Sequence, residues 1–110
     1  MNSHPDPLVG RWTHSWEEDF GDVRTYRRAG FTFPLSRRPR HVIDLMADGR
    51  VVSRSGGPAD AMVAREGRWN ARDLVLLTLH WEPPEEETAL EIVEQQQDLL
   101  KLRQLRGTID

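Results

Sequence analysis

Residues 8–16 alternate between two kinds of side chain, and this period of two restricts the fold more than any other feature of the chain. One face carries Leu8, Gly10, Trp12, His14 and Trp16. The other face carries Arg11, Thr13 and Ser15. Such alternation is typical of a strand that has one buried and one solvated face. A strand of this kind has to bury its apolar face against other strands, so we expect a sheet around a shared core.

The same reasoning predicts further strands along the chain. They are expected at residues 23–28, 41–46, 51–54, 61–70 and 74–81. The more apolar face of the last segment is formed by Val75, Leu77, Leu79 and Trp81. We expect that face to point inward, which leaves Thr78 and His80 on the outside.

A hairpin is predicted at residues 47–49, where Ala-Asp-Gly separates two of these strands. We expect a three-residue loop with Gly49 in the left-handed conformation, because this register sends Arg50 and Arg54 to solvent. The residues that it points inward are Ile43, Leu45, Val51 and Ser53.

Residues 88–106 are compatible with two structures. As two strands separated by a turn, they point Leu90, Ile92, Leu100 and Leu102 inward. As a helix, they begin with a capping box formed by Thr88 and Glu91 and contain many strong helix formers. We favour the strands, which predict an all-β fold: a small antiparallel up-and-down barrel of about seven or eight strands. The alternative is a six-stranded antiparallel sheet with a C-terminal helix.

Composition limits the class of protein. A chain of 110 residues is one domain, expected at residues 8–107 after a flexible tail at residues 1–7. The absence of cysteine excludes thiol nucleophiles, disulfides and zinc sites that need sulfur. Eighteen acidic residues against 15 basic ones give a net charge of −3, which favours neither nucleic acid nor a membrane as a partner. The polar start resembles no export signal, so we expect a cytoplasmic protein.

Residues 24–41 are rich in arginine and contain Tyr26, Phe31 and Phe33. Arginine next to stacking aromatic rings is one way of holding single-stranded nucleic acid or a phosphorylated ligand. Acidic residues at 17–19 and 82–87 can neutralise this charge within the same molecule. We therefore interpret the segment as a lid over one barrel end, with its arginines solvated or paired.

Few polar residues are expected at the barrel interior. The candidate ligand-binding residues, at the mouth of the barrel, are His14, Trp16, Tyr26, Phe31 and Phe33. His41 follows the arginine-rich segment and is interpreted as an exposed loop residue. The histidine spacings do not fit a metal site, and no serine lies in a nucleophile-elbow pattern. We therefore predict no catalytic residues, no metal and no cofactor.

The pattern Gly10-x-Trp12 resembles the signature that opens the first strand of lipocalin-like barrels. Its spacing to the turn at 47–49, to Gly67-Arg-Trp69 and to the Leu-Leu-x-Leu stretch at 99–102 is similar to that of small bacterial lipocalin-like proteins of uncharacterised function. The resemblance implies a barrel with a pocket for an apolar ligand. Trp12 and Trp69 are then structural residues, the first plugging one barrel end.

Three functions are compatible with these features. The leading one is a non-catalytic binder of a small apolar or amphiphilic ligand, as a monomer or homodimer. The second is a small barrel enzyme of the cyclase or isomerase type, which uses His14 or a carboxylate of residues 17–19 as acid or base. The third is a protein–protein interaction module that presents a helical leucine stripe from residues 88–106.

Overall fold

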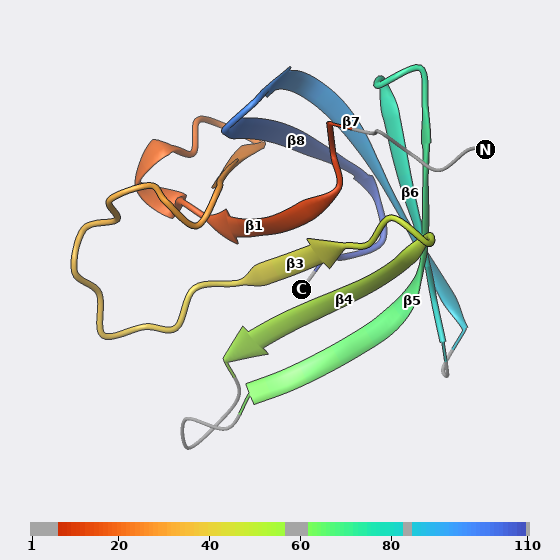
Figure 1. The fold of residues 1–110 in the computed structure, drawn as a ribbon, viewed down its shortest axis with the longest axis horizontal. Helices are drawn as coiled ribbons and strands as arrows, with labels where there is room; N and C mark the ends of the chain where they lie inside the picture. The colour runs from red at the N-terminus through yellow and green to blue at the C-terminus, as the bar shows by residue number, and fades with distance from the viewer. Residues whose placement is uncertain (1–6, 57–61, 83–84, 110) are drawn as a thin grey trace.

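The computed structural model describes residues 7–56, 62–82 and 85–109, and these form a closed antiparallel barrel (Figure 1). Its eight strands are β1 (Gly10–His14), β2 (Val23–Arg27), β3 (Val42–Leu45), β4 (Arg50–Gly56), β5 (Met62–Arg72), β6 (Leu76–Trp81), β7 (Glu86–Gln96) and β8 (Leu99–Arg106). A short 3₁₀ helix, η1 (Trp16–Glu18), follows β1. The predicted all-β barrel is confirmed. Among the described residues, no helix is long and apolar enough to cross a membrane.

The order of strands around the barrel is β1-β2-β8-β7-β6-β5-β4-β3, and β3 pairs back to β1. From β3 to β8 each strand therefore lies beside its neighbour in the sequence. At the start of the chain, β1 lies between β2 and β3, so the connection of residues 28–41 has to pass across one end of β1. In Figure 1 this connection is the long orange-to-yellow loop.

Residues 88–106 form most of β7 and β8, so the favoured strands are confirmed and the alternative of a C-terminal helix is wrong. These two strands close the barrel, because β7 pairs with β6 and β8 pairs with β2. Leu90, Ile92, Leu100 and Leu102 are buried, as the strand pattern predicts. A helix would have left Leu90 and Leu100 off its apolar stripe, so the burial of these side chains outweighs the local helix propensity.

The predicted hairpin between β3 and β4 is confirmed. Leu45 pairs with Val51, and Gly49 adopts a φ of 95° in the intervening loop. The interior residues of this hairpin are Ile43, Leu45, Val51 and Ser53, all of them buried. Arg50 lies on the exterior, and Arg54 forms an ion pair with Asp44 on the outer face. In β6, Leu77, Leu79 and Trp81 are buried and His80 is exposed, as predicted. Val75 was also expected to point inward, but it precedes β6 and is exposed.

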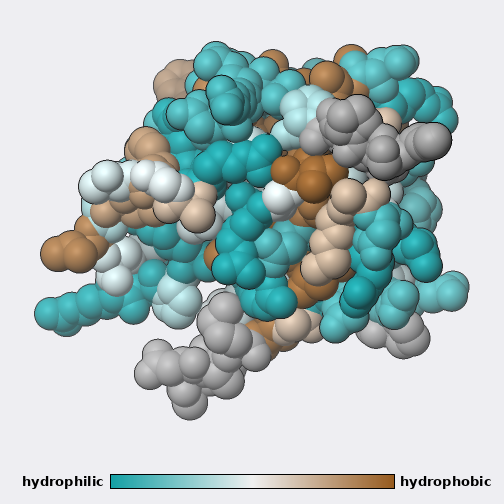
Figure 2. All heavy atoms as spheres, viewed as in Figure 1, coloured by the Kyte–Doolittle hydropathy of each residue, from teal (hydrophilic) through white to brown (hydrophobic). Residues whose placement is uncertain are grey.

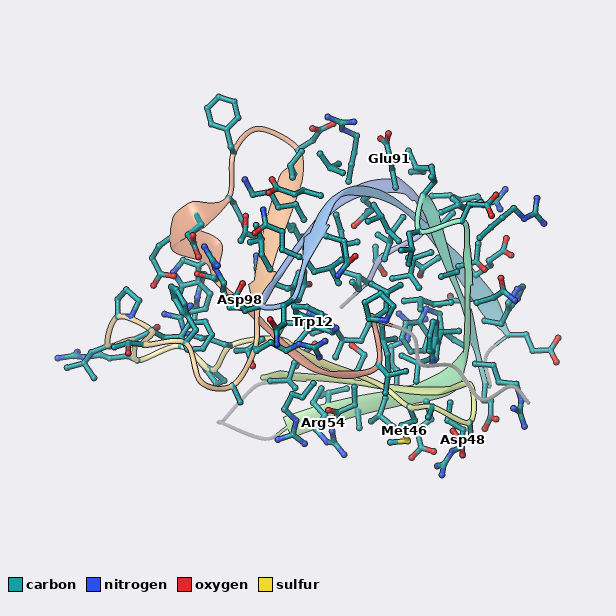
Figure 3. All side chains as sticks on the ribbon, turned by 45° about the horizontal axis from the view of Figure 1, so that its top comes forward. Trp12, Met46, Asp48, Arg54, Glu91 and Asp98 are labelled. Atoms are coloured by element: carbon teal, nitrogen blue, oxygen red, sulfur yellow. The ribbon has the colours of Figure 1, made fainter. Side chains whose placement is uncertain are left out.

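Side chains fill the barrel interior. The largest of those with less than 2% of their surface exposed are Trp12, Tyr26, Leu8, Ile43, Leu45, Leu77, Leu79, Leu90, Leu100, Leu102, Ile109 and Val51. Because these side chains keep almost no surface accessible to water, they pack closely against one another across the interior. Figure 3 shows Trp12 within the ring of strands, whereas Arg54 and Glu91 point outward. On the face drawn in Figure 2, polar side chains cover most of the surface and apolar ones form separate patches.

One end of the barrel is closed by Trp12 and Arg28. The Trp12 indole donates a hydrogen bond of 2.9 Å from Nε1 to the Leu8 carbonyl oxygen. The Arg28 guanidinium lies 3.7 Å from the centroid of the Trp12 ring and donates to the carbonyl oxygens of Pro7, Val9 and Gln97. Desolvation at this position lowers the pKa of Arg28. The arginine thus joins residues 7–9 to the β7–β8 turn over the plug that Trp12 forms.

Gly10 permits this closure. Its φ is 129°, a conformation that side-chain-bearing residues rarely adopt, and a Cβ atom there would overlap the Arg28 guanidinium. The group that approaches Gly10 closely is therefore the Arg28 guanidinium.

Replacing Gly10 with alanine is expected to lower the free energy of unfolding by about 1–3 kcal/mol, since it adds backbone strain and displaces Arg28. Gly30→Ala is the matched control, because nothing lies within 4 Å of a Cβ at Gly30. Urea unfolding of both variants measures the difference. Equal stability of the two variants would contradict this account of the closed end.

Candidate functional site

A pocket of about 260 Å³ lies at the end of the barrel where β1 finishes. Its walls are formed by His14, Trp16, Arg38, Pro39, His41, Ser55 and Gly56. These residues come from β1, η1, the 28–41 connection and β4, so the pocket brings together segments that are separate in the sequence. We call it the mouth pocket. It has aromatic and polar walls and is lined by no carboxylate among the described residues.

A buried chain of hydrogen bonds lies beside the mouth pocket. Ser53 Oγ donates to the Ile109 carbonyl oxygen at 3.1 Å. Because that hydroxyl proton is used, Ser53 Oγ accepts the proton of His41 Nε2 at 2.6 Å. His41 Nδ1 then accepts from the Tyr26 hydroxyl at 2.8 Å. The chain thus specifies the neutral Nε2–H tautomer of His41. It joins β2, the residue before β3, and β4 to Ile109.

The burial of His41 corrects the prediction that it is an exposed loop residue. Only 6% of its surface is exposed. His41 directly precedes β3, and the period of two that points Ile43 and Leu45 inward extends back to it. The signal was therefore in the sequence, but the neighbouring arginine-rich segment obscured it.

Residues 107–109 fold over the same end of the barrel. Gly107 adopts a φ of 72°, which turns the chain after β8. The Thr108 carbonyl oxygen accepts a hydrogen bond of 2.6 Å from Thr88 Oγ1, and Thr88 Oγ1 accepts one of 2.9 Å from Trp81 Nε1. Ile109 is 1% exposed. The Ile109 side chain fills interior space at the mouth of the barrel, so this space is not available to a ligand.

His14 is held in one orientation. Its Nε2 atom donates to the Asp19 carboxylate at 2.8 Å, and the other oxygen of Asp19 accepts from the Thr25 backbone N–H at 2.8 Å. The imidazole stacks on Tyr26 with a centroid distance of 5.1 Å and an interplanar angle of 24°. In the neutral imidazole Nε2 carries the proton donated to Asp19, so Nδ1 is an acceptor, and it has no hydrogen-bond partner in the part of the chain that the structure describes.

Trp16 does not continue the first strand, which corrects the prediction of a strand to residue 16. The strand ends at His14, and the Ser15 hydroxyl and carbonyl both bond to Glu18, which turns the chain into η1. The Trp16 ring reaches the mouth pocket from η1. Its edge meets the His14 ring at a centroid distance of 6.2 Å.

Two arginines of the 28–41 connection pack on Trp16 but differ in their partners. The Arg38 and Arg40 guanidinium carbons lie 4.4 Å and 4.2 Å from the centroid of its ring. Arg40 forms a two-pronged ion pair with Glu17 and donates to the carbonyl oxygens of His14 and Pro34. The hydrogen bonds from Arg40 lower the pKa of Glu17. Arg38 makes no ion pair with any described residue.

A second ion pair anchors η1 to β2. Arg27 donates to both oxygens of Glu18 at 2.9 and 2.8 Å, and this contact lowers the pKa of Glu18 to about 2. Arg27 also lies over the Phe31 ring at 4.8 Å from its centroid. Acidic residues of the preceding turn thus pair with the arginine-rich segment, as the charge pattern suggested.

The five predicted ligand-binding residues are brought to one end of the barrel but have different surroundings. His14 and Trp16 line the mouth pocket. Tyr26 lies beneath His14 and is fully buried. Phe31 and Phe33 pack against each other at 4.9 Å within the 28–41 connection, where Arg40 covers Phe33. The residues that sequence reasoning missed in this pocket are Arg38, Pro39, His41, Ser55 and Gly56.

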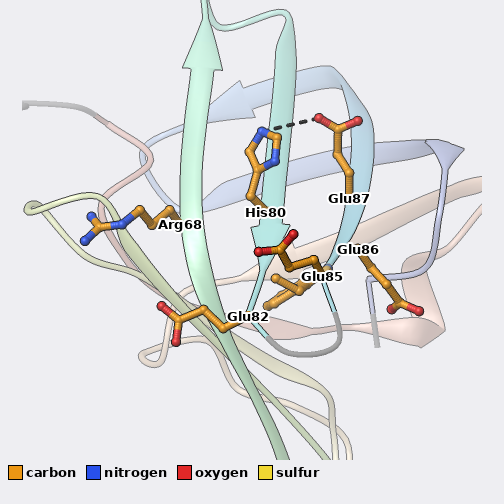
Figure 4. A pocket seen from close by; sticks show the side chains of 7 residues that line it. Arg68, His80, Glu82, Glu85, Glu86 and Glu87 are labelled. Carbon is orange, nitrogen blue, oxygen red and sulfur yellow. Dashed lines mark ion pairs between the residues drawn. The ribbon is translucent and has the colours of Figure 1, made fainter.

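A second, larger pocket of about 600 Å³ lies on the outer face of the barrel (Figure 4). It is lined by Arg68, His80, Trp81, Glu82, Glu85, Glu86 and Glu87. His80 is paired with Glu87 at 3.3 Å, as the dashed line shows. Within the described ranges, no group of three or more histidine, aspartate or glutamate side chains is arranged to hold a metal ion.

No family model matches the sequence, and no curated protein or solved structure is significantly similar to it. What the chain does therefore has to follow from the chemistry of its own side chains.

Replacing Tyr26 with phenylalanine is expected to lower the free energy of unfolding by about 1–3 kcal/mol, because it leaves the buried His41 Nδ1 without its donor. Thr78→Val serves as the control, since it removes a hydroxyl that bonds to Asn70 on the exposed face. Chemical denaturation gives the two free energies, and imidazole ¹⁵N shifts report the His41 tautomer. A Tyr26→Phe loss no larger than that of the control would contradict the role given to the buried chain.

Proposed function

We propose that this protein is a lipocalin-like barrel that binds a small amphiphilic molecule at the mouth pocket and does not transform it. The observation that carries the proposal is the pocket's position at the end of a filled barrel. Because Trp12, Tyr26 and the leucines around them fill the interior, the mouth is where a ligand meets both apolar and polar groups. This differs from a ligand held in the centre of a hollow barrel.

The lining of the mouth pocket suits a ligand with two kinds of surface. Trp16 and Pro39 offer apolar contact, whereas Ser55 and His14 offer hydrogen bonds. Binding sites for small molecules commonly combine apolar walls with a few placed polar groups. Rigid placement lowers the cost of ordering on binding, and here His14 is fixed by Asp19 and His41 by the buried chain.

The size of the pocket limits the ligand. Pockets for drug-sized ligands enclose roughly 300–1,000 Å³. The mouth pocket, at about 260 Å³, lies below that range. We therefore infer a compact ligand, such as a single substituted ring or a short branched chain.

A second candidate function is proton transfer to a bound ligand. The pairing of His14 with Asp19 orients an imidazole whose Nδ1 atom has no hydrogen-bond partner among the described residues, and a general base needs such an arrangement. In an isomerisation, Nδ1 would take a proton from one carbon of the ligand and return it to another. Exchange of ligand hydrogen with solvent deuterium distinguishes this activity from binding alone.

The proposed binding is tested by ¹⁹F NMR of protein labelled with 5-fluorotryptophan, which gives one signal for each of the four tryptophans. Trp16→Phe assigns the signal at the mouth. With a library of compact amphiphilic compounds, we expect a saturable shift of the Trp16 signal. The buried Trp12 and Trp69 signals are internal controls and should stay in place.

Two outcomes would contradict the proposal. One is that no compound in the library shifts the Trp16 signal. The other is that a bound compound shifts Trp12 instead, since that would locate the ligand in the interior.

A further inference from the structure

The charges around the mouth pocket are unequally compensated. Arg27 and Arg40 are each committed to a carboxylate, through two hydrogen bonds to Glu18 and Glu17. Arg38 lines the pocket, lies against the Trp16 ring and has no carboxylate partner among the described residues. A guanidinium in this position presents a fork of N–H donors that suits a planar carboxylate.

The surrounding lining does not offset that charge. Besides Arg38, the pocket is formed by the neutral residues Trp16, Pro39, Ser55 and Gly56 and by two histidines. The outer pocket around His80 is the opposite case, since four glutamates line it. An anionic ligand would therefore meet an attractive group at the mouth and a repulsive surface on the outer face.

His14 adds a second requirement. In the neutral imidazole, Asp19 holds the proton on Nε2, so the Nδ1 atom accepts but does not donate. An acceptor beside the pocket favours a ligand that carries a hydroxyl or N–H donor. His14 and Arg38 both contact Trp16, at 6.2 and 4.4 Å from its ring centroid, so one compact ligand can lie between them.

We propose that the ligand is a small monocarboxylate with a hydrogen-bond donor, such as a hydroxybenzoate, with its carboxylate on Arg38 and its donor on His14 Nδ1. This inference rests on the proposed binding function and specifies its ligand class. One charge is favoured over two, because among the described residues a single guanidinium without a carboxylate partner lines the pocket. A dianionic phosphate would leave its second charge without a fixed partner.

The experiment compares dissociation constants measured by NMR for the three isomeric hydroxybenzoates, benzoate, hydroxybenzamide and phenyl phosphate. We expect at least one hydroxybenzoate to bind about tenfold more tightly than its amide, because the amide lacks the charge-assisted contact. Arg38→Gln should abolish this preference. Arg37→Gln is the matched control, since it removes the same charge from an exposed neighbour that does not line the pocket.

The contact between the ligand hydroxyl and His14 Nδ1 is tested by His14→Phe. This variant keeps an aromatic ring over Tyr26 but removes the acceptor nitrogen. Hydroxybenzoate should then bind no better than benzoate, and the ¹⁹F signals of Trp12 and Trp69 check that the barrel is folded.

The outcomes separate this inference from the proposed function. If the amide or phenyl phosphate binds as tightly as the carboxylate, or if Arg37→Gln has the same effect as Arg38→Gln, the inferred ligand class is wrong although binding at the mouth stands. If His14→Phe leaves the advantage of the hydroxyl unchanged, the contact to Nδ1 is wrong. If none of these compounds, neutral or anionic, binds at Trp16, the proposed function fails as well.

Discussion

The buried chain from Tyr26 through His41 and Ser53 to Ile109 is the interaction on which the mouth of this barrel depends. It links β2, β3 and β4 to the last described residue, and every hydrogen of the chain has a defined acceptor. Buried polar groups are costly when unpaired, so the loss of one member penalises the whole chain. His14 stacks on Tyr26, and His41 lines the pocket. The geometry of the candidate site is thus a consequence of this chain.

Ion pairs anchor the connection that crosses the end of β1. Because β1 lies between β2 and β3, residues 28–41 have to span the barrel end. Arg40 binds Glu17 and the backbone of His14 and so anchors this connection at the mouth. Arg28, from the same connection, instead covers Trp12 at the opposite end of the barrel. Most arginines of residues 24–41 thus bind other groups of the same protein, although the arginine-rich sequence alone suggests an anionic partner. Arg38 differs because it lines the mouth pocket and has no carboxylate partner within the described part of the chain.

The strands could be predicted from the sequence because each has a buried and a solvated face. Local sequence pattern alone predicts the burial of Leu77, Leu79 and Trp81 and the hairpin at Gly49. The candidate site was harder to predict because it depends on contacts between distant residues. Nothing near His41 in the sequence indicates that Tyr26 and Ser53 will satisfy both of its nitrogens. Similarly, the pairing of Arg40 but not Arg38 becomes evident only when η1 is packed beside the connection.

The central claim is that this barrel is filled by its own side chains, which leaves the mouth as the place where a ligand binds. Xenon tests it directly, because it enters dry apolar cavities in proteins. Methyl signals of Leu77, Leu90 and Leu100, which point into the interior, are followed by NMR under increasing xenon pressure. The account predicts small shifts that stay linear with pressure and do not saturate. Saturable shifts of these methyl groups would reveal a hollow interior and contradict it.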